Sequence, residues 1–386
     1  MSLRKRSVMQ RPLNPFFTSP IIPGKYFCDR VKESERMIKL LTNGNNIVLI
    51  SPRRMGKTGL IRHVYASKEI SGRYNTFFVD ILHTTSLREL AFTLGKEIFD
   101  SLKPQGVKVL DGLLAVVKSL KSKLVYDPLT GLPEFSLQIG DISKPEYTLE
   151  EIFSYLESSS KPCLLTIDEF QQIREYSDDI NVEAMLRTKI QKMTNCRFVF
   201  SGSRRHVMID MFSSAKRPFY NSADTLALSP INPQTYTSFA VRMFNEYGKS
   251  ISDEEVLYVY DEFEGCTYNI QKVMNETFFS TPASSVADRL TVDEAVSTIL
   301  DSNSITYREL LSTLKERQKQ VLAAIAKERQ ATAVTSEDFI SRYSLPSASV
   351  VQNALRTLVK NELVYKDGNT YSVYDKFLAL WLRRNL

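Results

Sequence analysis

The sequence is poor in the residues that build zinc sites and disulfide frameworks. Its 386 residues include four cysteines, none of them in a C-x-x-C pair, and three histidines. A structural zinc site needs closely spaced cysteine and histidine ligands, and a disulfide scaffold needs paired cysteines. The sequence therefore predicts neither. Scattered single cysteines fit the reducing environment of the cytoplasm.

Long hydrophobic runs are also lacking. No stretch of eighteen apolar residues occurs, and the basic start, MSLRKRSVMQRPLNPFF, has no apolar segment of the signal-peptide kind. We therefore expect a cytoplasmic protein without a membrane partner. Hydrophobic residues make up 43% and charged residues 24%, which is enough to form folded cores, and the length predicts two or three domains. The net charge of +6 is compatible with nucleic acid without requiring it.

The most informative local pattern lies at residues 45–60, NNIVLISPRRMGKTGL. Its unbroken apolar run predicts a central parallel strand that is covered on both faces. The loop after it closes on Gly56-Lys57-Thr58, where backbone N–H groups at a helix start can bind phosphate oxygens. Lys57 is expected to contact the β- and γ-phosphates, and Thr58 to offer its hydroxyl to Mg²⁺. A basic surface turn is the alternative, because Ser51 replaces the first glycine of the phosphate-loop pattern.

The residues just before this strand form a second candidate contact region. Phe27, Arg30 and Glu33 suit a segment that folds over an adenine, although an ordinary amphipathic helix over residues 30–41 needs no such role. The predicted nucleotide-binding residues are Phe27, Arg30, Arg54, Met55, Gly56, Lys57, Thr58 and Gly59.

Two acids follow another apolar run, LLTI, at residues 164–167. Asp168 is expected to hold Mg²⁺ together with Thr58, and Glu169 to polarise the water that attacks the γ-phosphate. A solvated turn or a helix cap is the alternative for the two acids. The predicted metal ligands are therefore Thr58 and Asp168.

A serine pair, Ser201 and Ser203, ends the next predicted strand. Neighbouring strands of a parallel sheet end at the same edge, so a short hydroxyl there can contact the γ-phosphate or the attacking water. We prefer Ser203 for this role, with a simple Ser-Gly turn as the alternative. The predicted catalytic residues are Glu169, Lys57 and Ser203.

Strands and helices are predicted to alternate along the first 230 residues. Apolar runs typical of strands occur at 47–50, 76–82, 163–167, 197–201 and 225–228. Capping boxes at 86–89 and 148–151 predict two of the helix starts. Residues 103–147 interrupt the alternation and are expected to be an insertion, in which Phe135, Leu137 and Ile139 favour an edge strand. The pattern predicts an α/β fold with a doubly wound parallel sheet.

The remainder of the chain is predicted to be mainly helical. Asn232-Pro233 starts a helix, and capping boxes at 252–255 and 291–294 predict further short helices to about residue 302. Three helices then precede a hairpin signal, Asp367-Gly368-Asn369, which is typical of a winged helix. The predicted domains are a tail at 1–13, a P-loop ATPase domain at 14–230, a helical lid at 231–303 and a winged helix at 304–386.

Taken together, these motifs resemble the archaeal-type ATPase family, which is related to the AAA+ and STAND ATPases. The resemblance covers most of the chain and includes a Walker A loop, a Walker B strand, a helical lid and a winged helix. It rests on Asn14-Pro15-Phe16, residues 27–33, Pro52 to Thr58, Ile167 to Gln171, and Gly202-Ser203, with residues 265–271 and Trp381 matching later elements. The resemblance implies ATP and Mg²⁺ as cofactors, with Phe27 and Arg30 near the base, Lys57 and Thr58 on phosphates and metal, and Asp168 and Glu169 serving metal and water.

Two departures from the family pattern concern turnover. Ser51 replaces a glycine, and residues 218–222 read PFYNS where the family often has P-L-Y-G-R, so the arginine is missing. The missing arginine, with no arginine obvious in the lid element either, favours slow Mg²⁺-dependent ATP hydrolysis and a role as a nucleotide-dependent switch on a macromolecular partner. A winged-helix DNA-binding protein regulated by ATP is the alternative, with Arg356 and Lys360 available for double-stranded DNA. The sequence leaves open whether the partner is DNA or protein, and whether the chain forms oligomers.

Overall fold

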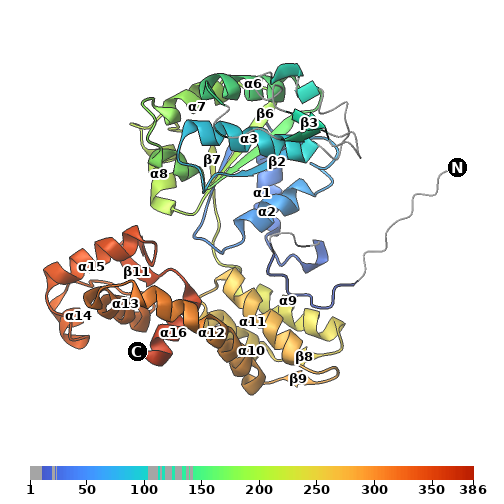
Figure 1. The fold of residues 1–386 in the computed structure, drawn as a ribbon. Coiled ribbons are helices and arrows are strands. Elements are labelled where there is room, and N and C mark those ends of the chain that lie inside the picture. Colours follow the sequence, from blue (N-terminus) through green and yellow to red (C-terminus); the bar gives the residue numbers. More distant parts are fainter. Residues whose placement is uncertain are drawn as a thin grey trace. The chain divides into compact units, whose positions relative to one another are not determined.

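A computed structural model describes residues 11–19, 22, 24–102, 112–113, 115–117, 124–126, 133–135, 139 and 142–386. The chain divides into two compact units. One unit is Pro20–Ser229, and the other combines Met1–Ser19 with Pro230–Leu386 (Figure 1). None of the described helices is long and apolar enough to cross a membrane.

The first unit is built on a five-stranded sheet of order β2-β5-β6-β1-β7. All neighbouring strands pair in parallel, which confirms the predicted α/β class. The strands are β1 (Ile47–Ile50), β2 (Asn75–Asp80), β5 (Cys163–Asp168), β6 (Cys196–Gly202) and β7 (Asp224–Ala227). The strand β1 that precedes the phosphate loop is therefore interior to the sheet.

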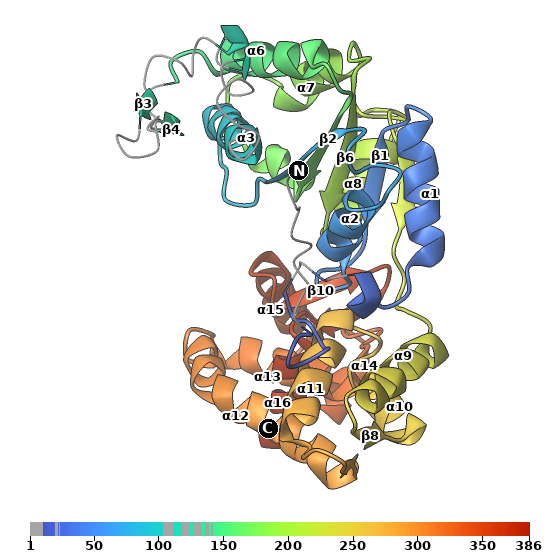
Figure 2. The ribbon, with the colours of Figure 1, turned by 90° about the vertical axis from the view of Figure 1, so that its right-hand side faces the viewer.

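Helices cover both faces of this sheet, as the unbroken apolar runs predict. Ile47 and Leu49 of β1 pack with residues of α1 and α2, whereas Val48 and Ile50 pack with residues of α3, α6, α7 and α8 on the other face. Figure 2 shows α1 and α2 on one side of the strands and α3 on the other. The helices are α1 (Val31–Thr42), α2 (Lys57–Tyr65), α3 (Leu87–Leu102), α6 (Pro145–Ser158), α7 (Val182–Ile190) and α8 (Arg205–Ser213), with a 3₁₀ helix η4 (Phe170–Glu175) after β5.

Two local predictions for this unit are wrong. The helix α6 begins at Pro145 rather than at the capping box expected at 148–151, because proline suits the first helical position and Lys144 occupies the cap. The edge strand predicted around Phe135 and Ile139 is present only at Phe135, which ends β4 (Pro133–Phe135), and this strand pairs antiparallel with β3 (Leu124–Tyr126) in a separate sheet, while Ile139 is not in a strand. Leu137, also part of that prediction, lies outside the described residues.

The second unit begins with four helices, α9 (Pro233–Glu246), α10 (Asp253–Glu262), α11 (Thr267–Ser280) and α12 (Arg289–Ser312). Asn232 and Ser252 cap α9 and α10 through their side chains, as predicted. The cap expected at Thr291 is wrong, because the Asp288 carboxylate accepts the Thr291 N–H and starts α12 three residues earlier. α12 is also one helix of 24 residues that continues past residue 302. A short parallel pair, β8 (Ser250–Ile251) and β9 (Val286–Ala287), lies beside these helices.

The N-terminal segment packs on these helices. Phe16 is fully buried, with its ring centroid 5.5 Å from that of Phe244, 5.9 Å from Phe278 and 6.1 Å from Phe239. The Asn275 side chain donates to the Phe16 carbonyl at 2.6 Å. Residues 11–19 therefore belong to the helical unit although they precede the sheet in sequence.

The chain ends in a winged helix, as predicted. Its elements are α13 (Glu316–Glu328), α14 (Glu337–Arg342), α15 (Ala348–Lys360), the hairpin strands β10 (Val364–Asp367) and β11 (Thr370–Val373), and a final helix α16 (Lys376–Asn385). The hairpin signal is confirmed by antiparallel pairing from Val364 with Val373 to Asp367 with Thr370. The helix α16 was not predicted, although Asp375 caps it by accepting the Phe377 and Leu378 N–H groups.

Candidate nucleotide-binding site

The loop between β1 and α2 has the backbone shape of an anion-binding site. Arg54 has φ 66° and Gly56 has φ 92°, so the chain turns twice through left-handed conformations just before α2 begins. Such turns direct successive N–H groups to one side, where the positive end of α2 adds to the attraction for an anion. Glycine is needed at position 56 for its conformation, since an added Cβ would meet no atom within 4 Å.

Lys57 lies at the first position of α2, and its side chain is buried. The ammonium Nζ donates to the Ser51 carbonyl at 3.1 Å and to the Pro52 carbonyl at 3.3 Å. Burial lowers the pKa of Lys57, while the nearby carboxylates of Glu169 and Asp168 raise it. The ammonium of Lys57 is thus buried against carbonyl oxygens of the phosphate loop. The sequence predicts that this ammonium binds phosphate.

Thr58 and Asp168 are brought together although they are 110 residues apart. The Thr58 hydroxyl donates to Asp168 Oδ2 at 3.5 Å. Burial raises the pKa of Asp168, and the neighbouring Glu169 carboxylate raises it too. One hydroxyl and one carboxylate fit Mg²⁺, which binds hard oxygen donors and usually takes its remaining ligands from water and phosphate. This donor pair could therefore hold the metal.

Glu169 follows β5 in a left-handed conformation, with φ 55°. Its Oε2 accepts the Ser203 hydroxyl at 2.7 Å, and the Gln171 amide Nε2 donates to the same oxygen. The sequence-predicted Ser203 thus contacts the predicted catalytic carboxylate directly. Arg53 also donates to the Ser203 hydroxyl, at 3.3 Å, and was not among the predicted site residues.

Gln171 and Gly202 form a close contact beside this carboxylate. A Cβ at Gly202 would lie 2.4 Å from Gln171 Oε1 and 2.6 Å from the Met208 side chain. Any larger residue would clash with these side chains, so the position requires glycine. The buried Gln171 Oε1 has no hydrogen-bond partner within the described residues. The Gln171 side chain is therefore held by the hydrogen bond that its amide nitrogen donates to Glu169 and by packing.

Phe27 lies against the start of α2. Its ring stacks on His63, with centroids 4.2 Å apart and planes 9° apart, and a Cβ at Gly59 would lie 3.5 Å from Phe27 Cε2. Burial lowers the pKa of His63, which favours a neutral ring at this stack. His63 was not predicted from sequence, because a lone histidine within a helix carries no motif.

Arg30 is buried, with 4% of its surface exposed, and contacts backbone carbonyls on two segments. Its guanidinium donates to the Met55 carbonyl of the phosphate loop at 3.2 Å and to the Ser229 carbonyl at 2.7 Å. A further bond to Glu33 at 2.8 Å holds the group in place. Arg30 and Met55, both predicted to contact the nucleotide, are thus joined to each other and to the last residue of this unit.

The segment that departs from the family pattern, residues 218–222, packs into the core beside the site. Phe219 is fully buried against Phe170, which follows Glu169, and against Phe200 and Phe212, with centroids 5.2 to 5.4 Å apart. This segment therefore anchors the chain that follows α8. Arg204, at the start of α8, pairs with Glu175 at 3.0 Å.

Comparisons with known protein families agree with this geometry. A model described as an ATPase domain predominantly from Archaea matches residues 27–273, and one described as a probable winged helix domain matches residues 305–384. An uncharacterized ATP-binding protein of Methanocaldococcus jannaschii is 28% identical over 168 residues, which are 40% of this chain and 45% of that protein. The chain thus matches less than half the length of this curated relative.

Solved structures share the fold at low sequence identity. The Walker-type ATPase of Pyrococcus abyssi superimposes with a TM-score of 0.65 and 18% identity, covering 96% of this chain and 99% of that one. The ORC2 protein of Aeropyrum pernix gives 0.54 and 14%, covering 96% of each chain. The ORC1 protein of the same organism, solved in complex with DNA, gives 0.52 and 14%, covering 97% of each chain.

Proposed function

Because this chain belongs to the family of ATPase domains found predominantly in Archaea, and carries a P-loop ATP-binding domain and a winged helix, we propose that it hydrolyses ATP with Mg²⁺ and acts as a nucleotide-dependent switch on a macromolecular partner. The observation that carries the proposal is the contact between Thr58 and Asp168 at the start of α2. It supports a phosphate and metal site rather than a basic surface turn.

The phosphates of ATP would bind the N–H groups of residues 54–58 and the Lys57 ammonium. Lys57 must then exchange its carbonyl partners for phosphate oxygens, which offer a stronger, charge-assisted bond. Mg²⁺, when bound through Thr58 and Asp168, would neutralise charge on the β- and γ-phosphates. Its positive charge would also balance the negative charge of the buried Asp168 carboxylate. Burial and the nearby Glu169 raise the pKa of this carboxylate.

Glu169 is the proposed general base for the attacking water. Ser203 and Gln171 donate hydrogen bonds to its carboxylate. Both of these residues are buried, so they hold the carboxylate in one orientation. Proton transfer to such a carboxylate would yield hydroxide-like character in the attacking water. Ser203 and Gln171 are positioning residues in this account.

Arg30 supports the switch part of the proposal. Its guanidinium connects the phosphate-loop carbonyl of Met55 to the carbonyl of Ser229, after which Pro230 begins the other unit. A shift of the loop on nucleotide binding would therefore act on the residue at the boundary between the units. We propose that this contact carries nucleotide state out of the phosphate site.

The test is phosphate release from ATP, measured with Mg²⁺ and with EDTA. The proposal predicts hydrolysis with Mg²⁺ and its loss with EDTA. Hydrolysis that continues unchanged in EDTA would exclude the metal role of Thr58 and Asp168.

DNA binding by the winged helix is the second candidate function. It is favoured by exposed cations on α15 and on the wing, at Arg356, Lys360 and Lys366, and the ORC1 protein of similar fold was solved with DNA. Phosphate contacts release counterions, so log affinity should fall with log salt by roughly 0.9 per contact. Fluorescence anisotropy with labelled duplex across a salt series tests this, and each alanine substitution at a contact should flatten the slope by about one.

A further inference from the structure

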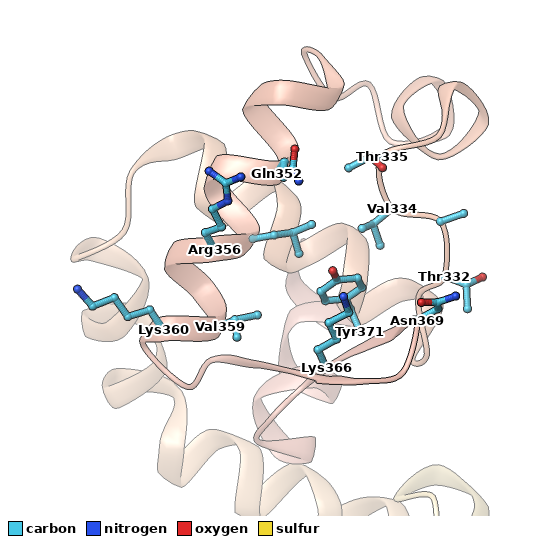
Figure 3. Close-up of a pocket in the computed structure, with 12 residues that line it drawn as sticks. Thr332, Val334, Thr335, Gln352, Arg356, Val359, Lys360, Lys366, Asn369 and Tyr371 are labelled. Atoms are coloured by element: carbon cyan, nitrogen blue, oxygen red, sulfur yellow. The ribbon is translucent and has the colours of Figure 1, made fainter. Parts of the chain in front are cut away.

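A groove of about 870 Å³ lies in the winged helix between α15, residues 332–335 and the β10–β11 hairpin. Figure 3 shows Arg356 and Lys360 along one edge, Thr332 and Thr335 along the opposite edge, and Tyr371 between them. Val334 and Leu355, which are buried, contribute apolar surface to the groove. All of the twelve residues that line it are described, and none of these is acidic.

Three of the lining residues, Arg356, Lys360 and Lys366, are cations without a carboxylate partner in the described part of the chain. Arg356 and Lys360 are four residues apart on α15 and so lie on one face of the helix. The Lys366 ammonium lies 5.4 Å from the centroid of the Tyr371 ring, inside the same groove.

Several other cations of this unit pair with acids. Arg342 pairs with Glu328 at 2.7 Å, Lys376 with Glu264 at 2.8 Å, and Arg329 with Glu262 at 2.6 Å. The groove thus brings together three cations that no carboxylate of the described residues neutralises. An anionic ligand would find both complementary charge and an apolar floor there.

The distribution of charge on α15 and the wing favours an acidic polypeptide over duplex DNA as the ligand of this groove. A recognition helix lies in the major groove of DNA and contacts base edges mainly with its N-terminal residues. In α15 these residues, 348–352, read ASVVQ and include no cation, and the wing carries the exposed acid Asp367.

We propose that this groove binds an extended acidic segment of a partner protein. Carboxylates of the segment would pair with Arg356, Lys360 and Lys366, and an aliphatic side chain between them would pack against Val334 and Leu355. The inference rests on the proposed switch function, because it names the class of partner on which the switch acts.

The experiment is fluorescence anisotropy of the full chain with a short labelled peptide that has leucines set among aspartates and glutamates. The double variant Arg356→Glu, Lys360→Glu should weaken binding by about tenfold or more, since two attractive pairs become repulsive. The double variant Arg308→Glu, Arg317→Glu is the matched control, because it makes the same charge change at two exposed residues of the same unit outside the groove, and should bind like wild type. Replacing the peptide's leucines by serines should also weaken binding, because the apolar floor loses its contact.

Equal peptide binding by wild type and the double variant would overturn the proposal. So would salt-dependent binding of a labelled duplex without binding of the peptide, which would instead establish the DNA candidate. Repeating the titration with ADP and with a non-hydrolysable ATP analogue separates the two proposals. Peptide affinity that is lost in the double variant but equal in both nucleotide states would support the groove and contradict the switch.

Discussion

At the scale of single residues, the Lys57 ammonium is the positive charge that faces the predicted phosphates. Lys57→Ala should weaken ATP binding at least about tenfold, since a charge-assisted bond to phosphate is lost. The backbone of α2 should keep its fold, because alanine favours a helix. Isothermal titration with ATP checks this, and Lys68→Ala, an exposed lysine beyond α2, is the control. Unchanged ATP affinity in a folded Lys57→Ala variant would exclude this loop as the site.

Substitutions of the two acids after β5 should cause different functional defects. Glu169→Gln should bind ATP with nearly wild-type affinity and lose most hydrolysis, about 100-fold or more, because amide nitrogen and oxygen cannot accept the proton of water. Asp168→Ala should in addition lose the Mg²⁺ dependence of ATP binding, because a metal ligand is removed. Titration calorimetry with and without Mg²⁺, paired with phosphate-release assays, measures both properties. An identical, purely binding defect in the two variants would show that the assigned roles are wrong.

At the scale of elements, the N-terminal segment places one large side chain, Phe16, in the core of the helical unit. Phe16→Ala should reduce the free energy of unfolding by about 3–5 kcal/mol, because it leaves a cavity among three aromatic rings. Leu13→Ala is the matched control, since Leu13 is 96% exposed and should change stability little. Denaturant unfolding measures both variants. Equal stability of the two would show that residues 11–19 do not contribute to the fold of this unit.

The contact that Arg30 makes between the phosphate loop and Ser229 should couple the two segments. Arg30→Ala should retain ATP binding within several-fold yet lose the nucleotide dependence of protease cleavage near residues 229–232, because the connection to Met55 is cut. Arg36→Ala changes an exposed arginine of the same helix and should leave that dependence intact. Limited proteolysis with and without nucleotide distinguishes them. Retained nucleotide dependence in Arg30→Ala would remove this residue from the switch.

Elements with a dominant local signal were predictable from the sequence. The strands of the sheet, the caps at Asn232 and Ser252 and the hairpin at Asp367-Gly368 are each specified by a few neighbouring residues. The start of α12 differs from the prediction because Asp288 and Thr291, three residues apart, are both capping residues, and the Asp288 carboxylate accepts the Thr291 N–H so that Thr291 lies inside the helix. The helix α16 was missed because its short apolar run follows a strand without proline or glycine between them.

The site was only partly predictable, because some of its contacts depend on distant segments. The pairing of Thr58 with Asp168 and of Glu169 with Ser203 follows from strand ends that meet at one sheet edge. The stacking of Phe27 on His63 and the contact of Arg30 with Ser229 require a tertiary arrangement that no local pattern specifies. The role predicted for Arg30 near the base stays a prediction.

At the scale of the whole molecule, the chain passes from the helical unit to the sheet unit and back again. Residues 11–19 and 230–386 belong to one unit and residues 20–229 to the other, so two chain segments join them. One of these junctions follows Ser229, the residue that Arg30 contacts. The proposed shift of the phosphate loop would reach the helical unit through the hydrogen bonds of Arg30 and the peptide link from Ser229 to Pro230.

Hydrogen–deuterium exchange of the full chain, compared between ADP and a non-hydrolysable ATP analogue with Mg²⁺, tests the nucleotide-dependent switch most directly. The account predicts that exchange changes at residues 51–58, at residues 229–236 and in the winged helix, with the last two changes lost in Arg30→Ala. Exchange that changes at residues 51–58 while the second unit behaves identically with both nucleotides would contradict it.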